Sequence, residues 1–250
     1  MCCFAGARDV DVSGTNIFAR MLDTAPGHQV LAYSMSLEVD TEVAMVLPLP
    51  VLPGSGEDAL RFIDLSAFPD MFRDLAQLFE VRALGRSWDG EVQGHSALEV
   101  HEVGSFVASY VPSRADFVRL DPRFRIADAL FDAVPHYADY GFAVFQLAPG
   151  RTTVHPMSFS FPTRHPDHIY FPTVHVHDGT FHSAARFDHS LYYQHATAYY
   201  EAGGRFGRDE ISHGNVERSY RGIAAAGHQV VRRELKGTYV NEDVWIPTSG

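Results

Sequence analysis

The sequence has few cysteines and no long apolar run. Its only cysteines among 250 residues are Cys2 and Cys3. Adjacent cysteines cannot close a long loop, and a bridge between them has strained geometry, so we expect no structural disulfide. No stretch of about 18 apolar residues occurs, and the first residues lack the basic and apolar parts of a leader. The sequence therefore predicts neither secretion nor a membrane span, and favours a cytoplasmic location.

Clustered positive charge is absent as well. The chain has 20 Lys and Arg against 31 Asp and Glu, a formal charge of −11. Because phosphate recognition needs clustered cations, we expect no nucleic-acid partner. The motifs GxSxG, GxGxxG and the Walker loop are also missing, which argues against a serine-nucleophile elbow and a phosphate cradle. We expect a small-molecule or peptide substrate as the partner.

The chain is long and apolar enough to bury one core, with 46% hydrophobic residues. Its periodicity predicts a single α+β domain over residues 1–250, β-rich with mainly antiparallel sheets and few helices. The predicted strands cover residues 15–20, 30–39, 43–51, 98–111, 140–147, 154–161 and 168–177. The first two flank a Pro26-Gly27 turn and should form a hairpin. Helical spacing predicts helices over 68–79 and 126–134.

Three segments carry more specific expectations. Segment 43–51 contains Pro48 and Pro50, which cannot donate to a ladder, so we expect it at a sheet edge. Segment 187–205 is either a helix or an irregular aromatic stretch, because its period does not decide. The polar C-terminal segment 205–250 should end in a hairpin of strands 229–235 and 238–246 about Lys236-Gly237.

Histidine is abundant, with 14 residues, and many of them lie in the His-rich segment 155–195. His175 and His177 are separated by one residue within an apolar, strand-like sequence. Alternate residues of a strand point to the same side, so both imidazoles should project into one volume and could bind one metal ion. His182 and His189 could complete the ligand set. Such a set suits one transition-metal ion, copper, zinc or iron, without selecting among them.

Each of these residues also has a structural interpretation. Histidines commonly hydrogen-bond to carbonyls and carboxylates without binding a metal. Asp178 and Asp188 could be ligands, could orient a ligating imidazole, or could be turn and cap residues. The sequence leaves these alternatives open.

The position of Cys2 suggests a second chemistry. Removal of Met1 would leave a free α-amine, whose pKa is about 8, beside a thiol that it could activate. The first 25 residues, with Met1-Cys2, a turn at Gly14 and the sequence Arg20-Met21-Leu22-Asp23, resemble the start of choloylglycine hydrolases and penicillin V acylases. The resemblance implies that Cys2 is a nucleophile supported by Arg20 and Asp23. Alternatively, Cys2 or Cys3 could join the histidines as a thiolate ligand.

A wider resemblance covers most of the chain. The stretch ending in LPLPV, the helix after it, and YGFAVFQLAPG followed by HPMSFSFPTRHPDHIYFPTVHVHDG are similar to a group of uncharacterised bacterial proteins. That resemblance implies no activity.

These observations give three functional hypotheses. The first is a metal-dependent enzyme that acts on a small molecule or peptide by oxidation or hydrolysis, with a site built from His175 and His177. The alternative is an N-terminal-nucleophile cysteine amidohydrolase that uses Cys2. The second alternative is a metal-binding protein without catalytic activity.

Overall fold

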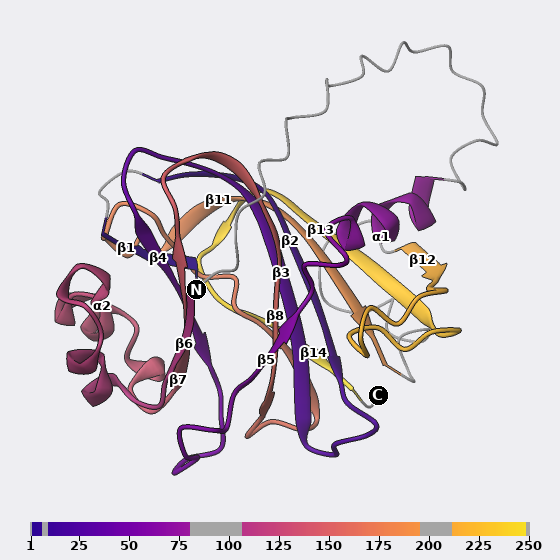
Figure 1. Ribbon diagram of the computed structural model, residues 1–250, viewed down its shortest axis with the longest axis horizontal. Helices are drawn as coiled ribbons and strands as arrows, with labels where there is room; N and C mark the ends of the chain where they lie inside the picture. The colour runs from indigo at the N-terminus through magenta and orange to yellow at the C-terminus, as the bar shows by residue number, and fades with distance from the viewer. Residues whose placement is uncertain (1, 7–9, 81–106, 196–211, 249–250) are drawn as a thin grey trace.

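The fold is dominated by β-strands packed in two large sheets (Figure 1). A computed structural model describes residues 2–6, 10–80, 107–195 and 212–248. Its strands are β1 (Cys2–Ala5), β2 (Asp11–Met21), β3 (His28–Val39), β4 (Val43–Leu49), β5 (Arg61–Asp64), β6 (Val107–Val111), β7 (Gly141–Leu147), β8 (Gly150–Pro162), β9 (His168–Phe171), β10 (His175–Val176), β11 (Ala184–Gln194), β12 (Ser212–Asn215), β13 (Gln229–Val240) and β14 (Val244–Pro247). The prediction of a β-rich chain is confirmed.

The first sheet has the order β10-β1-β4-β7-β6, and the second has the order β12-β13-β11-β2-β3-β8-β5. A separate pair joins β14 to β9. Only the pairs β1–β10 and β2–β11 are parallel among the described residues, and the other strand pairs are antiparallel. Both parallel pairs lie near the histidine-rich segment, so they shape the site described below.

Strand β3 shows how the sequence builds the core. Its side chains alternate between the two faces of the seven-stranded sheet. Leu31 and Tyr33 join the apolar cluster between the sheets, whereas Val30 and Ala32 join a smaller cluster on the other face. Because both faces are covered, the strand is apolar along most of its length.

Helices cover the outer faces of the sheets. Helix α1 (Met71–Glu80) buries Met71 and Leu75 in the same cluster as Val30, which confirms the helix predicted over 68–79. Helix α2 (Asp128–Ala133) lies within the predicted segment 126–134 and is accompanied by the short 3-10 helices η2 (Arg114–Arg119), η3 (Pro122–Phe124) and η4 (Pro135–Tyr137). The ring of Phe131 contacts Phe142 of β7, with centroids 5.6 Å apart. These helices therefore seal the five-stranded sheet.

The edge position predicted for segment 43–51 is wrong. Strand β4 lies between β1 and β7 and is buried along its whole length. Its pairing with β1 covers only Ala44 to Val46 and stops before Pro48. The missing N–H of Pro48 therefore removes no hydrogen bond from the described pairing with β1, and an inner position is tolerated.

The C-terminal hairpin is also wrong. Strand β13 continues through Lys236 and Gly237, which pair with Asp188 and Phe187 of β11. Because β13 pairs with β11 from Val231 to Val240, the chain turns only after Val240. Strand β14 then pairs with β9 instead of returning along β13.

Two other segments differ in detail from the predictions. Segment 168–177 divides into β9 and β10, and the first part of 187–205 is the strand β11. Residues 98–106 of the predicted strand 98–111 and residues 196–205 lie outside the described residues, whereas 107–111 form β6. Within the described part of the chain, no helix has the length and apolar character needed to cross a membrane.

Candidate functional site

The histidine-rich site begins with the two-residue strand β10. Its backbone pairs with β1 through Cys2 with His175 and Cys3 with Val176. The side chain of Asn241 accepts the N–H of His175 at 2.7 Å and donates to the carbonyl oxygens of His175 at 2.9 Å and His182 at 2.8 Å. Because Asn241 is 4% exposed, these bonds are shielded from water. They compensate for the short pairing of β10.

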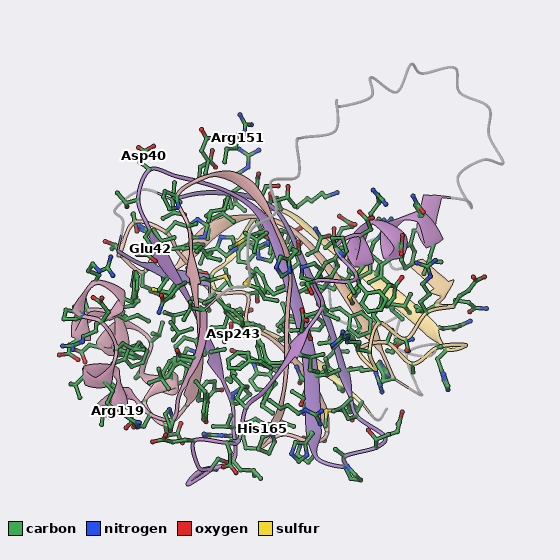
Figure 2. The ribbon with its side chains drawn as sticks, in the orientation of Figure 1. Asp40, Glu42, Arg119, Arg151, His165 and Asp243 are labelled. Carbon is green, nitrogen blue, oxygen red and sulfur yellow. The ribbon has the colours of Figure 1, made fainter. Side chains whose placement is uncertain are left out.

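The chain before β10 is fixed by Asp243, which lies in the middle of the molecule in Figure 2. Its carboxylate accepts the backbone N–H groups of Thr173 at 2.9 Å and Val174 at 3.2 Å. It also accepts the hydroxyls of Tyr137 at 2.5 Å and Tyr170 at 2.9 Å. Burial, together with this carboxylate, raises the pKa of both tyrosines well above the usual value, so they remain protonated donors.

Three imidazoles meet where β10 lies against β11. The Nε2 atoms of His175 and His189 are 3.0 Å apart, and the rings of His175 and His177 stack with centroids 4.9 Å apart. The ring of Phe187 packs against the imidazole of His175, with ring centroids 4.5 Å apart. His175 and His177 therefore occupy the same volume, as the strand spacing predicts.

Burial makes these histidines weak bases. It lowers the pKa of His175 to about 3, with a further contribution from His177. His189 is 0% exposed, and burial lowers its pKa well below the usual value. Burial also lowers the pKa of His177, although the nearby carboxylates oppose this effect. All three imidazoles are neutral at pH 7, and one Nε2 of the His175–His189 pair donates its proton to the other.

His182 lies outside this group. It is exposed, and its Nε2 lies 2.9 Å from Asp178 Oδ2. Asp178 also accepts the N–H of Thr180 at 2.9 Å and has a lowered pKa, chiefly because of the bond with His182. Asp188 accepts the backbone N–H of Gly14 at 2.5 Å. The two aspartates thus have turn and strand-linking contacts.

The cysteines adjoin the cluster through the backbone. Cys3 is 2% exposed and packs in the main core, while the backbone of Cys2 lies opposite His175. No group of three or more His, Cys, Asp or Glu side chains in the described parts of the chain could hold a metal ion. The physical reason is visible in the contacts, since His175 and His189 hydrogen-bond to each other and His182 bonds to Asp178.

Arg20 and Asp23 lie elsewhere. Arg20 Nη1 is 3.3 Å from Asp23 Oδ2, and the guanidinium donates to the carbonyls of Ile223 at 2.7 Å and Gly222 at 2.9 Å. Along the β2–β11 ladder, Arg20 pairs with Gln194. That position is roughly 16 Å beyond His189 at the usual rise per residue of a strand. The structure therefore does not bring Arg20 and Asp23 to Cys2.

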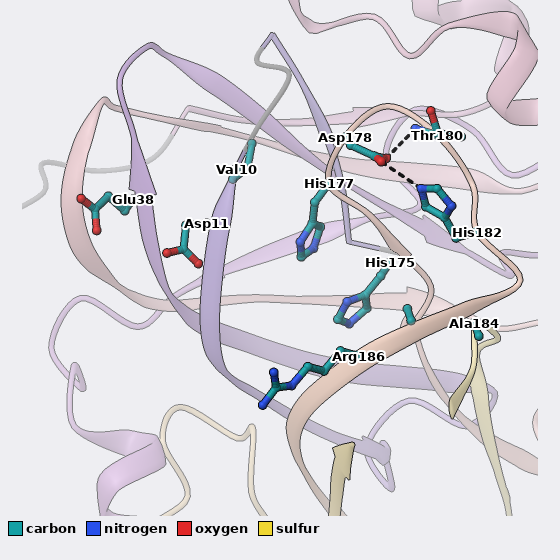
Figure 3. A pocket seen from close by; sticks show the side chains of 11 residues that line it. Val10, Asp11, Glu38, His175, His177, Asp178, Thr180, His182, Ala184 and Arg186 are labelled. Carbon is teal, nitrogen blue, oxygen red and sulfur yellow. Dashed lines mark hydrogen bonds and ion pairs between the residues drawn. The ribbon is translucent and has the colours of Figure 1, made fainter. Parts of the chain in front are cut away.

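A pocket of about 570 Å³ opens beside the histidine cluster (Figure 3). His175 and His177 form part of its wall, and Asp11 and Glu38 of neighbouring strands lie on one side. Arg186 of β11 and Asp178 are the other charged side chains of its lining. Asp11, Arg186 and Asn241 are not predicted from the sequence, because the role of each depends on contacts between segments far apart in the chain. The only local signal is the position of Asp11 and Arg186 on exposed strand ends.

Comparison with known proteins places the fold. No family model and no curated protein matches the chain. Among solved structures, the chain is similar to the crystal structure of baculovirus P35, with a TM-score of 0.56, 13% identity and 99% of each chain covered. The crystal structure of the caspase-8/P35 complex matches with a TM-score of 0.49 and 13% identity, covering 95% of this chain and 97% of the other.

These findings correct the functional hypotheses. The prediction of a metal-dependent oxidoreductase or hydrolase is wrong, because the described residues form no metal-holding group and the fold is similar to that of baculovirus P35. The alternative of a metal-binding protein without catalytic activity is wrong because the described residues form no metal-holding group. The amidohydrolase alternative is wrong as well, since the structure does not bring Arg20 and Asp23 to Cys2 and the fold is similar to that of baculovirus P35. No comparison tests the two sequence resemblances, which stay predictions. What the comparison shows is the fold, and that fold is similar to the fold of baculovirus P35.

Proposed function

We propose that this chain acts by binding a protein partner, a protease of the caspase class, and that it is not itself an enzyme. The observation that carries the proposal is the likeness to baculovirus P35 over 99% of both chains. P35 has been crystallised as a complex with caspase-8. The two-sheet framework described above would present the partner with a rigid surface, since both sheets are covered and packed.

The composition supports a protein partner. The charge of −11 disfavours nucleic acid, and a negative surface favours encounter with a partner that carries basic residues near its contact area. The buried imidazoles are neutral and engaged with one another, which suits a structural role better than proton transfer at pH 7.

The experiment mixes purified chain with active caspase-8 and follows three readouts: co-elution by size exclusion, peptidase activity on a fluorogenic aspartyl peptide, and intact mass. We expect a complex at micromolar concentrations, and the mass spectrum reports any cleavage after an aspartate in the same sample. A papain-like cysteine protease serves as the matched control and should not co-elute. Separate elution of the chain and caspase-8 at 10 μM each, with unchanged peptidase activity, refutes the proposal.

We also infer that the chain folds as one α+β domain and works in the cytoplasm. Support for one domain comes from the core cluster, which contains residues of both large sheets. The two cysteines are adjacent and are predicted to form no structural disulfide, which suits a reducing compartment. Coincident unfolding transitions by circular dichroism and by tryptophan fluorescence are expected for one domain. Two separated transitions would contradict it.

A further inference from the structure

The pocket beside the histidines lies where the neighbouring strands β2 and β11 are not yet paired. Strands β2 and β11 are paired in parallel from Asn16 and Ser190 onward. A register shift in the β2–β3 ladder falls between Ser13 and Asn16, and the bond from Gly14 N–H to Asp188 is the described link just before the ladder starts. Earlier residues of the two strands do not pair with each other, and the pocket of about 570 Å³ lies there.

The charged side chains around this pocket divide into satisfied and unsatisfied ones. Asp178 is bonded to His182 and to the N–H of Thr180, and Glu38 lies 3.5 Å from Arg151. Asp11 and Arg186 also line the pocket, but neither has a hydrogen bond or ion pair with any residue that the structure describes. Within the described part of the chain, the carboxylate of Asp11 and the guanidinium of Arg186 thus have no ion pair, with each other or with another side chain, although Asp11 interacts electrostatically with His177.

The position of Asp11 adds to this imbalance. Asp11 lies directly opposite Glu38 in the β2–β3 ladder. Like charges at opposite positions of neighbouring strands destabilise a sheet. A ligand ammonium group placed against Asp11 would relieve that repulsion. A ligand carboxylate could form a bidentate ion pair with Arg186.

Part of the wall of this pocket carries no charge. His175 and His177 are uncharged at pH 7, and their stacked rings border the pocket in Figure 3. Such a surface accepts an aromatic or apolar group. The volume lies within the range of about 300–1,000 Å³ that is usual for small-molecule sites.

We propose that this pocket binds a zwitterionic ligand of the amino acid or short peptide class. Its amine contacts Asp11, its carboxylate pairs with Arg186, and its apolar side chain packs on the imidazole rings of His175 and His177. This site is separate from the proposed binding of a protease, and its test does not involve a protease.

The test uses the dipeptide glycyl-L-phenylalanine as the probe, with its N-acetyl and C-terminal amide analogues, titrated into the isotope-labelled full chain by NMR. We expect saturable shifts at Ala184 and Ala185, which line the pocket. Each blocked analogue should bind about tenfold more weakly, because it loses one charge-assisted contact.

Two variants assign the contacts. Arg186→Gln should bind the dipeptide and its amide equally, while Asp11→Asn should bind the dipeptide and its N-acetyl form equally. Arg119→Gln, which changes an exposed arginine of η2 that is not part of the pocket lining, is the matched control and should keep the full discrimination. Absence of saturable shifts at 10 mM dipeptide overturns the proposal, as does equal affinity of all three ligands for the unmodified chain.

Discussion

Asn241 provides the sharpest test of how the histidine site is held together. Its amide makes three hydrogen bonds, of 2.7, 2.9 and 2.8 Å, to backbone groups of His175 and His182. In Asn241→Ala those groups lose their partner. A net contribution of about 1 kcal/mol for each bond predicts a loss of about 3 kcal/mol in the free energy of unfolding. That is a large fraction of the roughly 5–15 kcal/mol typical of a domain.

Urea unfolding followed by circular dichroism measures this loss, and hydrogen exchange of the His175 amide reports the local effect. We expect a lower midpoint with an unchanged slope, and faster exchange at His175 than at Leu31 in the core. Asn16→Ala is the matched control, because the Asn16 side chain makes one exposed bond to Gly14 O at 2.8 Å. It should change the stability by less than about 0.5 kcal/mol. Equal stabilities of the two variants would refute the reasoning.

Three further predictions concern burial and packing. Because burial holds the pKa of His189 below that of the unfolded chain, its contribution is complete above about pH 6.5 and is lost as the pH falls. His189→Phe should therefore flatten the decline in unfolding free energy between pH 6.5 and 5 by up to about 1.4 kcal/mol per pH unit, and parallel urea-midpoint profiles would contradict this. Tyr170→Phe removes the hydroxyl's bonds to Pro48 O at 3.0 Å and to the Asp243 carboxylate at 2.9 Å, so thermal and urea unfolding should show a loss of about 2 kcal/mol in the free energy of unfolding. The control Tyr239→Phe removes one exposed bond of 3.3 Å to Lys236 O and should cost less than about 0.5 kcal/mol. Gly141→Ala places a Cβ 2.5 Å from Tyr110 Oη and should lower the free energy of unfolding in urea by about 1–3 kcal/mol. The added change Tyr110→Phe should recover part of this loss. No recovery would show that the ring of Tyr110, and not its hydroxyl, is the obstacle.

Part of the fold was readable because neighbouring residues determine it. The alternation in segment 30–39 predicts a strand whatever it packs against, and the apolar spacing of Met71, Phe72 and Leu75 predicts one helical face. The wrong edge position of β4 has a different origin. It depends on the pairing of β4 with β1, a segment about forty residues away in the sequence.

The candidate site divides in the same way. The spacing of His175 and His177 predicts correctly that their rings share one volume. Which residues complete that volume could not be predicted, since His189 reaches it from β11 whereas His182 turns to Asp178. Spacing along the chain does not distinguish His182 from His189 as the partner of His175, because the turn between β10 and β11 would allow either histidine to reach it.

The sequence by itself determined the class of the molecule: a β-rich, acidic chain with two adjacent cysteines and a concentration of histidines in one segment. Composition and local periodicity carry this information, because they depend on residues a few positions apart. The tertiary structure alone decided that His175 and His189 bond to each other, that Arg20 lies away from Cys2, and that Asp11 and Arg186 border one pocket. The physical reason is that strand order and register bring together side chains from distant segments, and burial then fixes their protonation and their partners.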